Sequence, residues 1–131
     1  MATTILIVDD DEAVRSTLTR ILEKNREFRV VGEAGDGSEA LELARTLSPD
    51  LILMDLAMPR VNGLEATRSI KAERPETKVI IITRYQEDAY RQAAAQSGAD
   101  AFLPKGTRVP ELLTTIRKVL EGSPGKKATL A

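Results

Sequence analysis

Carboxylates occur at two points in this sequence, each directly after a short apolar run. The run Asp9-Asp10-Asp11-Glu12 follows one such stretch, and Asp55 follows another. If the two stretches are neighbouring strands, at least three carboxylates converge in one crevice. Like charges in a partly buried crevice raise one another's pKa unless a cation compensates them. A hard divalent ion with oxygen ligands is the simplest compensation, with Mg²⁺ expected first and Mn²⁺ as its substitute.

Two members of the acidic run have a simpler explanation. Asp11 and Glu12 fit a solvated turn whose charge meets the positive end of the following helix. Asp9, Asp10 and Asp55 are therefore the candidate metal ligands. For Asp55 the competing interpretation is a strand terminator or a helix cap.

Two other side chains close apolar runs further along the chain. Thr83 follows Val79–Ile82 and Lys105 follows Ala101–Pro104. Taken singly, each is expected to be structural or solvated. Beside three acids, however, a hydroxyl donor and an ammonium suit a phosphoryl group, which a carboxylate nucleophile can accept as an aspartyl phosphate. The metal and Lys105 would neutralise the charge on the phosphoryl oxygens.

The elements that must position these residues can be predicted from apolar spacing. Short apolar or β-branched runs predict five strands: Thr4–Asp9, Phe28–Ala34, Leu51–Asp55, Lys78–Thr83 and Ala101–Pro104. Several of them are nearly all apolar, as strands buried on both faces are. Helical periodicity predicts a helix after each strand: around 14–22, 41–47, 62–74, 87–96 and 112–120. The helix at 87–96 has mostly Ala on its apolar side, so we expect it to be loosely held.

Residues with turn and cap preferences mark several helix ends. Asn62 and Glu65 have capping-box spacing, Gly98 suits the position after a helix, and Pro110 suits the first helical position. Residues 123–131 lose the helical period and are expected to form a tail or the start of a linker after a domain at 4–122.

Strict alternation of strand and helix predicts an α/β fold with one parallel sheet. Right-handed crossovers place helices on both faces of the sheet. The expected architecture is a flavodoxin-like (βα)5, doubly wound, five-stranded sheet of order 2-1-3-4-5. In that order the C-terminal ends of strands 1 and 3 lie side by side, which is where ligands bind in such folds.

Composition excludes several classes of function. The 131 residues include no cysteine and no histidine, which rules out disulfides, thiol chemistry and His-based catalysis. The net charge of −1 gives no field that would draw the chain onto nucleic acid or an anionic membrane. No apolar run approaches the roughly 20 residues of a spanning helix. With no export signal at its start, the chain is expected to be cytoplasmic.

Four segments together resemble the receiver domains of two-component response regulators. They are Ile5-Leu6-Ile7-Val8-Asp9-Asp10, then Pro49-Asp50-Leu51-Ile52-Leu53-Met54-Asp55-Leu56-Ala57-Met58-Pro59 leading to Asn62-Gly63, then Ile82-Thr83, and finally Phe102-Leu103-Pro104-Lys105. The resemblance covers essentially Thr4 to Gly122. The stretch Asn62 to Arg68 looks most like receivers that precede a C-terminal helix-turn-helix DNA-binding domain of the LuxR type. No such domain follows within these residues, so we expect either a piece of a transcription regulator or a stand-alone receiver.

The resemblance implies a role for each candidate residue. Asp55 is the phosphoacceptor, and Asp9 and Asp10 form the acid pair, with Asp10 the closer ligand of Mg²⁺. The Ala57 carbonyl completes the protein's share of the coordination, and Thr83 and Lys105 bind the phosphoryl group. Phe102 changes rotamer as Thr83 moves, which alters the face made of the helix at 87–96, the strand Ala101–Pro104 and the helix at 112–120.

The resemblance also implies the partners of the chain. A sensor histidine kinase or phosphotransfer protein supplies the phosphoryl group, and its choice depends on a patch around helix 1. A homodimer can form on phosphorylation. The chain is then a phosphoacceptor that promotes only its own phosphorylation and dephosphorylation, and is not an enzyme acting on other substrates.

Two positions depart from the usual receiver pattern, and two more match positions that vary within it. Arg84 stands where a small residue usually admits the phosphodonor, so it either alters access, contacts the phosphoryl group or simply points into solvent. Gly106 replaces a Pro that often follows the Lys, which removes an expected cis peptide and favours a more mobile loop. Tyr85, like Ala57, matches a position that tunes phosphoryl lifetime, and we expect Tyr85 to shield the aspartyl phosphate from water.

Three alternative functions remain to be weighed. A haloacid-dehalogenase-like phosphatase wants a second Asp two residues after the nucleophile, where this chain has Ala57. A flavodoxin-like FMN module needs a Ser/Thr/Gly-rich loop after strand 1, where the acidic run would repel the FMN phosphate. A degenerate receiver would bind partners without phosphorylation, but all five site residues are present and only Arg84 gives reason to consider it.

Overall fold

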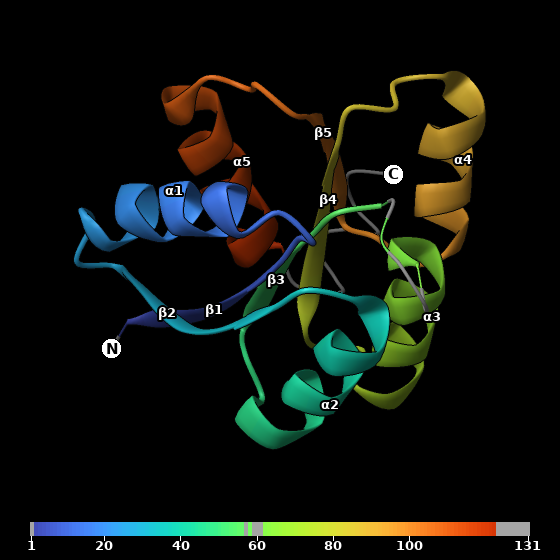
Figure 1. The fold of residues 1–131 in the computed structure, drawn as a ribbon, viewed down its shortest axis with the longest axis horizontal. Coiled ribbons are helices and arrows are strands. Elements are labelled where there is room, and N and C mark those ends of the chain that lie inside the picture. Colours follow the sequence, from blue (N-terminus) through green and yellow to red (C-terminus); the bar gives the residue numbers. More distant parts are fainter. Residues whose placement is uncertain (1, 57, 59–61, 123–131) are drawn as a thin grey trace.

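A computed structural model describes residues 2–56, 58 and 62–122 of the chain. Five parallel strands form one sheet in the order β2-β1-β3-β4-β5, which confirms the predicted order (Figure 1). The elements alternate along the chain as β1 (Thr3–Val8), α1 (Glu12–Glu23), β2 (Phe28–Ala34), α2 (Gly37–Leu47), β3 (Leu51–Met54), α3 (Gly63–Glu73), β4 (Lys78–Thr83), α4 (Asp88–Gln96), β5 (Ala101–Pro104) and α5 (Val109–Glu121).

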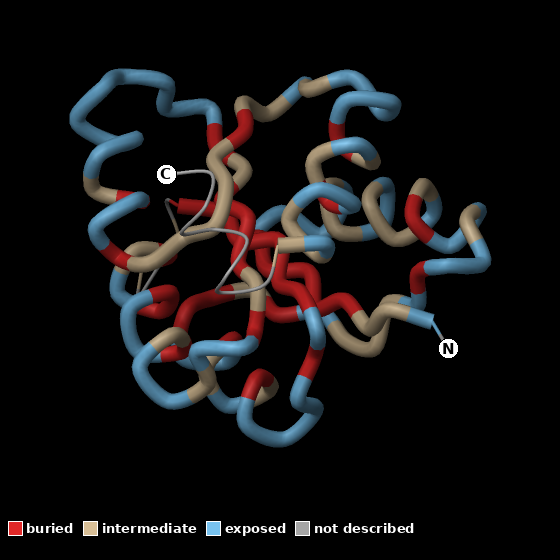
Figure 2. The backbone as a smooth tube through the Cα atoms, turned by 180° about the vertical axis from the view of Figure 1, so that it is seen from behind, coloured by how far each residue is buried: buried red, intermediate tan, exposed pale blue. Residues whose placement is uncertain are grey.

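The sheet lies between two helical layers, as predicted (Figure 1). On one face α1 and α5 pack through Leu22 and Ile116 against Ile5, Ile7 and Leu53 of the strands. On the other face α2, α3 and α4 supply a second apolar cluster. Alternate residues of one strand enter opposite clusters because successive side chains point to opposite faces. The buried central strands are visible in Figure 2.

Cap residues explain where α2 and α3 begin on the second face. The side chain of Asp36 accepts a hydrogen bond from the amide of Glu39 at the start of α2. Asn62 does the same for Glu65 at the start of α3, and its own amide nitrogen donates to the Glu65 carboxylate. The predicted Asn62 cap and its pairing with Glu65 are therefore confirmed, but the Glu65 carboxylate accepts from the Asn62 side chain and not from its backbone amide, as it would in a full capping box. These caps fix the points at which the chain leaves the edge of the sheet that carries the candidate site.

Several boundaries differ from the sequence-based expectation by one residue. β1 ends at Val8 and β3 at Met54, so Asp9 and Asp55 stand just past their strands. Pro110 is the second helical residue of α5, because Val109 begins that helix. Gly98 follows α4 with a φ of 99°, as expected after a helix end. Gly106 has a φ of 90°, and no peptide bond among the described residues is cis.

None of the helices among the described residues is both long and apolar enough to cross a bilayer. α4 buries only Ala94, in agreement with its predicted small apolar face. The expectation that α4 is loosely held stays a prediction. The predicted tail at 123–131 lies outside the described residues.

Candidate functional site

The backbone of the site is fixed because sheet hydrogen bonds continue just past the strand ends. The amide of Asp9 donates to Ala34 O at 3.0 Å, and that of Asp55 donates to Val8 O at 2.8 Å. The amide of Lys105 donates to Thr83 O at 2.8 Å. Parallel strands bring their C-terminal ends to one edge of the sheet, so these bonds place the candidate side chains together.

Three carboxylates meet at this edge, as the sequence predicts. Oxygens of Asp9, Asp10 and Asp55 lie within 4.8 Å of one another. Asp9 and Asp55 are only 3% and 5% exposed, whereas Asp10 is open to solvent. A ligand held here would therefore contact two buried carboxylates and one exposed carboxylate.

Lys105 is the cation that pairs with the buried carboxylates. Its Nζ lies 3.0 Å from Asp9 Oδ2 and 3.5 Å from Asp55 Oδ2. Partial burial lowers the pKa of the Lys105 ammonium, but the Asp9 and Asp55 carboxylates outweigh that effect and raise it above its ordinary value. Lys105 therefore carries its charge at neutral pH and holds it between the two acids.

The single positive charge of Lys105 does not balance three carboxylates, and the pKa of Asp55 is raised as a result. Burial and the neighbouring Asp9 charge raise the pKa of Asp55 to about 6, although Lys105 and a hydrogen bond from the Leu56 amide oppose this. That amide lies 2.9 Å from Asp55 Oδ1. The donor set is all oxygen and carries excess negative charge, so it fits a hard divalent cation.

Two contacts orient Asp9 that sequence reasoning did not find. The Asp11 amide donates to Asp9 Oδ1 at 2.9 Å. Arg15 of α1 donates from Nη1 to the Asp9 carbonyl at 2.7 Å, while its Nε pairs with Glu33 of β2 at 3.0 Å. Arg15 thus ties α1 and β2 to the start of the acidic run. No motif marks Arg15, because its role depends on contacts between separate elements.

Gly63 is a second positioning residue. A Cβ added there would fall inside the contact radius of the Asp55 carbonyl oxygen, and the Gly63 amide donates to Leu56 O at 2.9 Å. The first residue of α3 therefore packs directly against the backbone of Asp55. Asn62-Gly63 was part of the receiver resemblance in the sequence, and it is the feature that could have indicated this close contact.

Thr83 lies at the site edge but is not bonded to the acids. Its side chain is fully buried, and its Oγ1 accepts a hydrogen bond from the Tyr85 amide at 3.2 Å. Phe102 is half-buried in β5, with the Arg91 guanidinium 4.9 Å from its ring centroid. Tyr85 is 38% exposed, and its ring is 5.3 Å from that of Tyr90.

A cavity of about 570 Å³ opens above the acids. It is lined by Asp10, Asp11, Glu12, Asp55, Arg84, Tyr85 and Lys105. The cavity gives a small anionic or metal-bound group room beside Asp55. Arg84 and Tyr85, which the sequence predicts as modulating residues, both line it. Ala57, whose carbonyl is a predicted ligand, lies outside the described residues.

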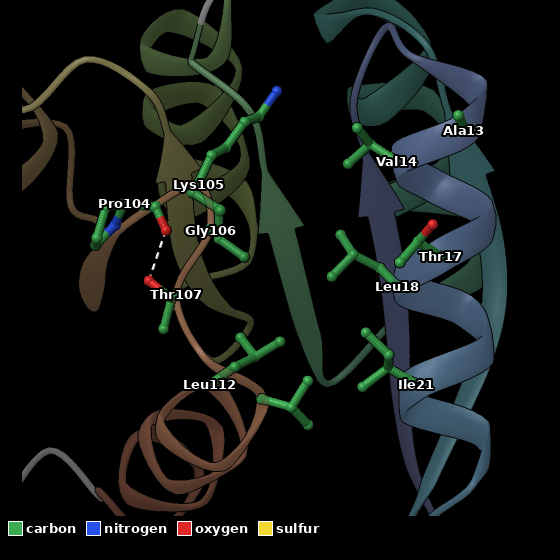
Figure 3. Close-up of a pocket in the computed structure, with 12 residues that line it drawn as sticks. Ala13, Val14, Thr17, Leu18, Ile21, Pro104, Lys105, Gly106, Thr107 and Leu112 are labelled. Atoms are coloured by element: carbon green, nitrogen blue, oxygen red, sulfur yellow. Dashed lines mark hydrogen bonds between the residues drawn. The ribbon is translucent and has the colours of Figure 1, made fainter.

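A second cavity, of about 360 Å³, lies between α1 and the segment that joins β5 to α5. Figure 3 shows Val14, Leu18 and Ile21 of α1 facing Leu112 across it. Lys105 lines both cavities, with its ammonium among the site acids. The apolar groove and the acidic cavity are therefore adjacent.

Comparison with protein families gives one match over most of the chain. Residues 5–117 match the model of the response regulator receiver domain. GacA of Pseudomonas aeruginosa, a response regulator, is 41% identical over 118 residues, which is 90% of this chain and 55% of GacA. The transcriptional regulatory protein LiaR of Bacillus subtilis is 39% identical over 97% of this chain and 60% of LiaR. The chain thus spans little more than half the length of these relatives.

Solved structures agree with the sequence comparisons. The response regulator domain of Thermotoga maritima CheB superposes with a TM-score of 0.88 at 36% identity, covering 95% of this chain and all of that domain. A LuxR-family two-component response regulator from Aurantimonas gives a TM-score of 0.87 at 32% identity, covering 98% of this chain and 94% of the other.

Proposed function

Because the chain belongs to the response regulator receiver family of two-component systems, we propose that its acidic edge accepts a phosphoryl group on Asp55. The observation that carries this proposal is the arrangement around Asp55. A buried carboxylate with one oxygen held by the Leu56 amide lies beside Lys105, under a cavity large enough for a phosphodonor. These are the positioning and electrostatic elements that phosphoryl transfer needs.

The proposed step is an in-line displacement at phosphorus. An Asp55 carboxylate oxygen forms a bond to the phosphorus atom as the bond from phosphorus to the donor atom breaks. The donor leaves with that electron pair, and Asp55 becomes an acyl phosphate. Lys105 stabilises the charge on the phosphoryl oxygens, since its ammonium already lies within 3.5 Å of Asp55 Oδ2. The nucleophile must be ionised, so the carboxylate form of Asp55 is the reactive one.

Asp9, Asp10 and Asp55 would hold the metal ion, which we propose to be Mg²⁺, with Mn²⁺ as a substitute. When bound, the ion supplies positive charge that screens the carboxylates and the phosphoryl oxygens. Arg15 and the Asp11 amide keep Asp9 in place for this role. The Ala57 carbonyl remains the fourth proposed protein ligand.

The signal leaves the site through Thr83 and Phe102. A Thr83 hydroxyl that turns to donate to a phosphoryl oxygen gives up its present bond from the Tyr85 amide. That change frees space toward Phe102 of β5, which lies next to α4 through its contact with Arg91. The proposed output surface is accordingly the α4-β5-α5 face, which can also support a homodimer.

The partners follow from the family and from the length of the relatives. We propose that a sensor histidine kinase or phosphotransfer protein supplies the phosphoryl group in the cytoplasm and docks at the apolar groove beside α1 (Figure 3). Since relatives such as LiaR, of which this chain covers 60%, are longer transcriptional regulators, the proposed output is control of transcription through a DNA-binding domain beyond this chain. The receiver turns over no other substrate.

The intact mass of the protein tests this function. Wild type and Asp55→Asn are incubated with acetyl phosphate, with Mg²⁺ or with EDTA. We expect one added phosphoryl group on the wild type with Mg²⁺ only, and none on Asp55→Asn. Asp11→Asn is the matched control, since it removes a neighbouring charge while keeping a side-chain acceptor for the Ala13 amide. Equal phosphorylation of Asp55→Asn, or none of the wild type with any small donor, would refute the proposal.

A further inference from the structure

Arg84 occupies a position in the acidic cavity that the proposed mechanism leaves unexplained. It directly follows Thr83 at the end of β4 and lines the cavity together with Asp55 and Lys105. Since β4 and β5 are neighbouring strands, Arg84 and Lys105 reach the cavity from adjacent strand ends. The cavity therefore has two cationic side chains on its β4-β5 side and an acidic wall contributed by the residues after β1.

The backbone that carries Arg84 is held in place on both sides. The Tyr85 amide donates to Thr83 Oγ1 at 3.2 Å, and Gln86 Nε2 donates to Thr83 O at 2.7 Å. The first bond joins the Tyr85 backbone to Thr83, and the second joins the Gln86 side chain to it. The Gln86 bond does not involve the Thr83 hydroxyl, so it still ties the Arg84 backbone to the end of β4 when that hydroxyl turns toward a phosphoryl group.

The Arg84 guanidinium has no ionic partner within the part of the chain that the structure describes, although it lines a cavity rich in acids. Asp10, Asp11, Glu12 and Asp55 line the same cavity, yet no hydrogen bond or ion pair joins Arg84 to any of them. By contrast, Lys105 pairs with both buried acids and Arg15 pairs with Glu33. Arg84 keeps its full set of donors available to a group that enters the cavity.

Charge balance indicates what that group is. With a divalent ion bound, the charges of Asp9, Asp10 and Asp55 would be matched by the ion and Lys105, while Asp11 and Glu12 add further negative charge to the cavity wall. Phosphorylation turns the single negative charge of Asp55 into the two of an acyl phosphate, which adds one more negative charge without a cation to match it. We propose that Arg84 supplies the missing positive charge by donating to a phosphoryl oxygen, and so acts as a second phosphoryl-binding cation beside Lys105. This inference rests on the proposed function of Asp55.

An arginine is suited to this role because its planar fork of donors can engage two phosphoryl oxygens at once. Phosphoryl binding by Arg84 and obstruction of the donor path by Arg84 have opposite effects on the affinity for a phosphoryl mimic. A phosphoryl-binding Arg84 favours the phosphorylated state, so its removal weakens binding of a phosphoryl mimic. An obstructing Arg84 disfavours entry, so its removal strengthens that binding.

Two ligands of opposite charge distinguish these roles in Arg84→Gln. With saturating Mg²⁺, the phosphoryl mimic fluoroberyllate should bind this variant roughly tenfold more weakly than wild type, as expected for loss of one charge-assisted hydrogen bond. Without fluoride, Mg²⁺ alone should bind the variant at least as tightly as wild type, because a repelling cation has been removed. Both affinities are measured from tyrosine fluorescence and checked by nuclear magnetic resonance titration.

Control variants separate a specific contact from general charge or folding effects. Arg29→Gln removes the same charge from β2, outside the cavity, and should leave fluoroberyllate binding unchanged. Arg84→Lys should recover part of the affinity, since it restores the charge without the fork. The melting temperature of Arg84→Gln should equal that of wild type, because Arg84 has no described partner to lose.

Unchanged or tighter fluoroberyllate binding by Arg84→Gln overturns the inference. So does an equal loss in Arg29→Gln, which would indicate only the net charge. If wild type and Arg84→Gln bind fluoroberyllate equally well and both accept a phosphoryl group on Asp55, the proposed function stands. Arg84 then has no part in it. A wild type that binds no fluoroberyllate and accepts no phosphoryl group refutes both.

Discussion

Opposing influences act on the carboxyl group of Asp55. Burial and Asp9 favour its neutral form, whereas Lys105 and the Leu56 amide favour the ionised form that can attack phosphorus. With the pKa of Asp55 raised to about 6, the group is mostly ionised at neutral pH but is held there at a cost in free energy. That cost is what a divalent cation at the site would relieve.

The raised pKa predicts how the stability of the metal-free protein depends on pH. Folded Asp55 binds its proton more tightly than unfolded Asp55, because its pKa rises from 3.8 to about 6. Its contribution to stability is therefore fully present below about pH 4 and lost as the pH rises through about 6. The side chain of Asp55→Asn cannot ionise. In EDTA, its melting temperature minus that of wild type, measured by circular dichroism, should therefore be larger at pH 7.5 than at pH 4.5. A difference that is the same at both pH values would contradict the prediction.

The junction of β3 and α3 is the element-level feature that controls Asp55. β3 ends at Met54, and α3 begins at Gly63 with its first residue against the Asp55 carbonyl. The position of Asp55 therefore depends on how closely the start of α3 packs against it. The Asn62 cap fixes where α3 begins, and the absence of a Cβ at Gly63 permits the close approach.

Gly63→Ala should therefore destabilise the protein, although Ala is the better helix former by about 1 kcal/mol. The new Cβ overlaps backbone atoms, which can only move by shifting Asp55 or α3, and such overpacking costs about 1–3 kcal/mol. Urea unfolding should show the loss, and phosphorylation by acetyl phosphate should slow. Gly35→Ala is the matched control, since its Cβ meets only Arg15 Nη1 at an ordinary 3.6 Å. Equal stability of the two variants would show that the junction adapts without cost.

At the scale of the whole molecule, the fold could be predicted from the sequence because its signals are local and agree with one another. Apolar runs marked each strand, and their alternation with helices left few topologies. Asp9, Asp10, Asp55 and Lys105 could be brought together on paper because parallel strands share one C-terminal edge. Their proposed roles, in contrast, come from a resemblance and await the phosphorylation test.

Side-chain contacts between separate elements could not be predicted from the sequence. Arg15 braces Asp9 from α1, and Arg91 lies over Phe102 from α4, yet neither pairing has a fixed spacing. The ends of β1 and β3 were also predicted one residue too late. Asp9 and Asp55 lie past the strands, although their amides still make hydrogen bonds to the neighbouring strand. Side-chain partners depend on packing geometry, which periodicity does not encode.

The site joins residues from the ends of β1 and β3, so its metal affinity exists only in the folded chain. An ion that binds the native state alone stabilises it by mass action, by about 2.7 kcal/mol at a hundredfold excess over its dissociation constant. Thermal denaturation at pH 7.5 should therefore show a melting temperature that rises with Mg²⁺ concentration. Asp10→Asn should abolish most of the rise, because it removes one of the three clustered oxygens. Asp11→Asn, which removes the adjacent charge, should keep it, and NaCl at matched ionic strength should not reproduce it. A rise of the same size in both variants would mean that Mg²⁺ acts by general screening of the acidic run and not through the three clustered carboxylates.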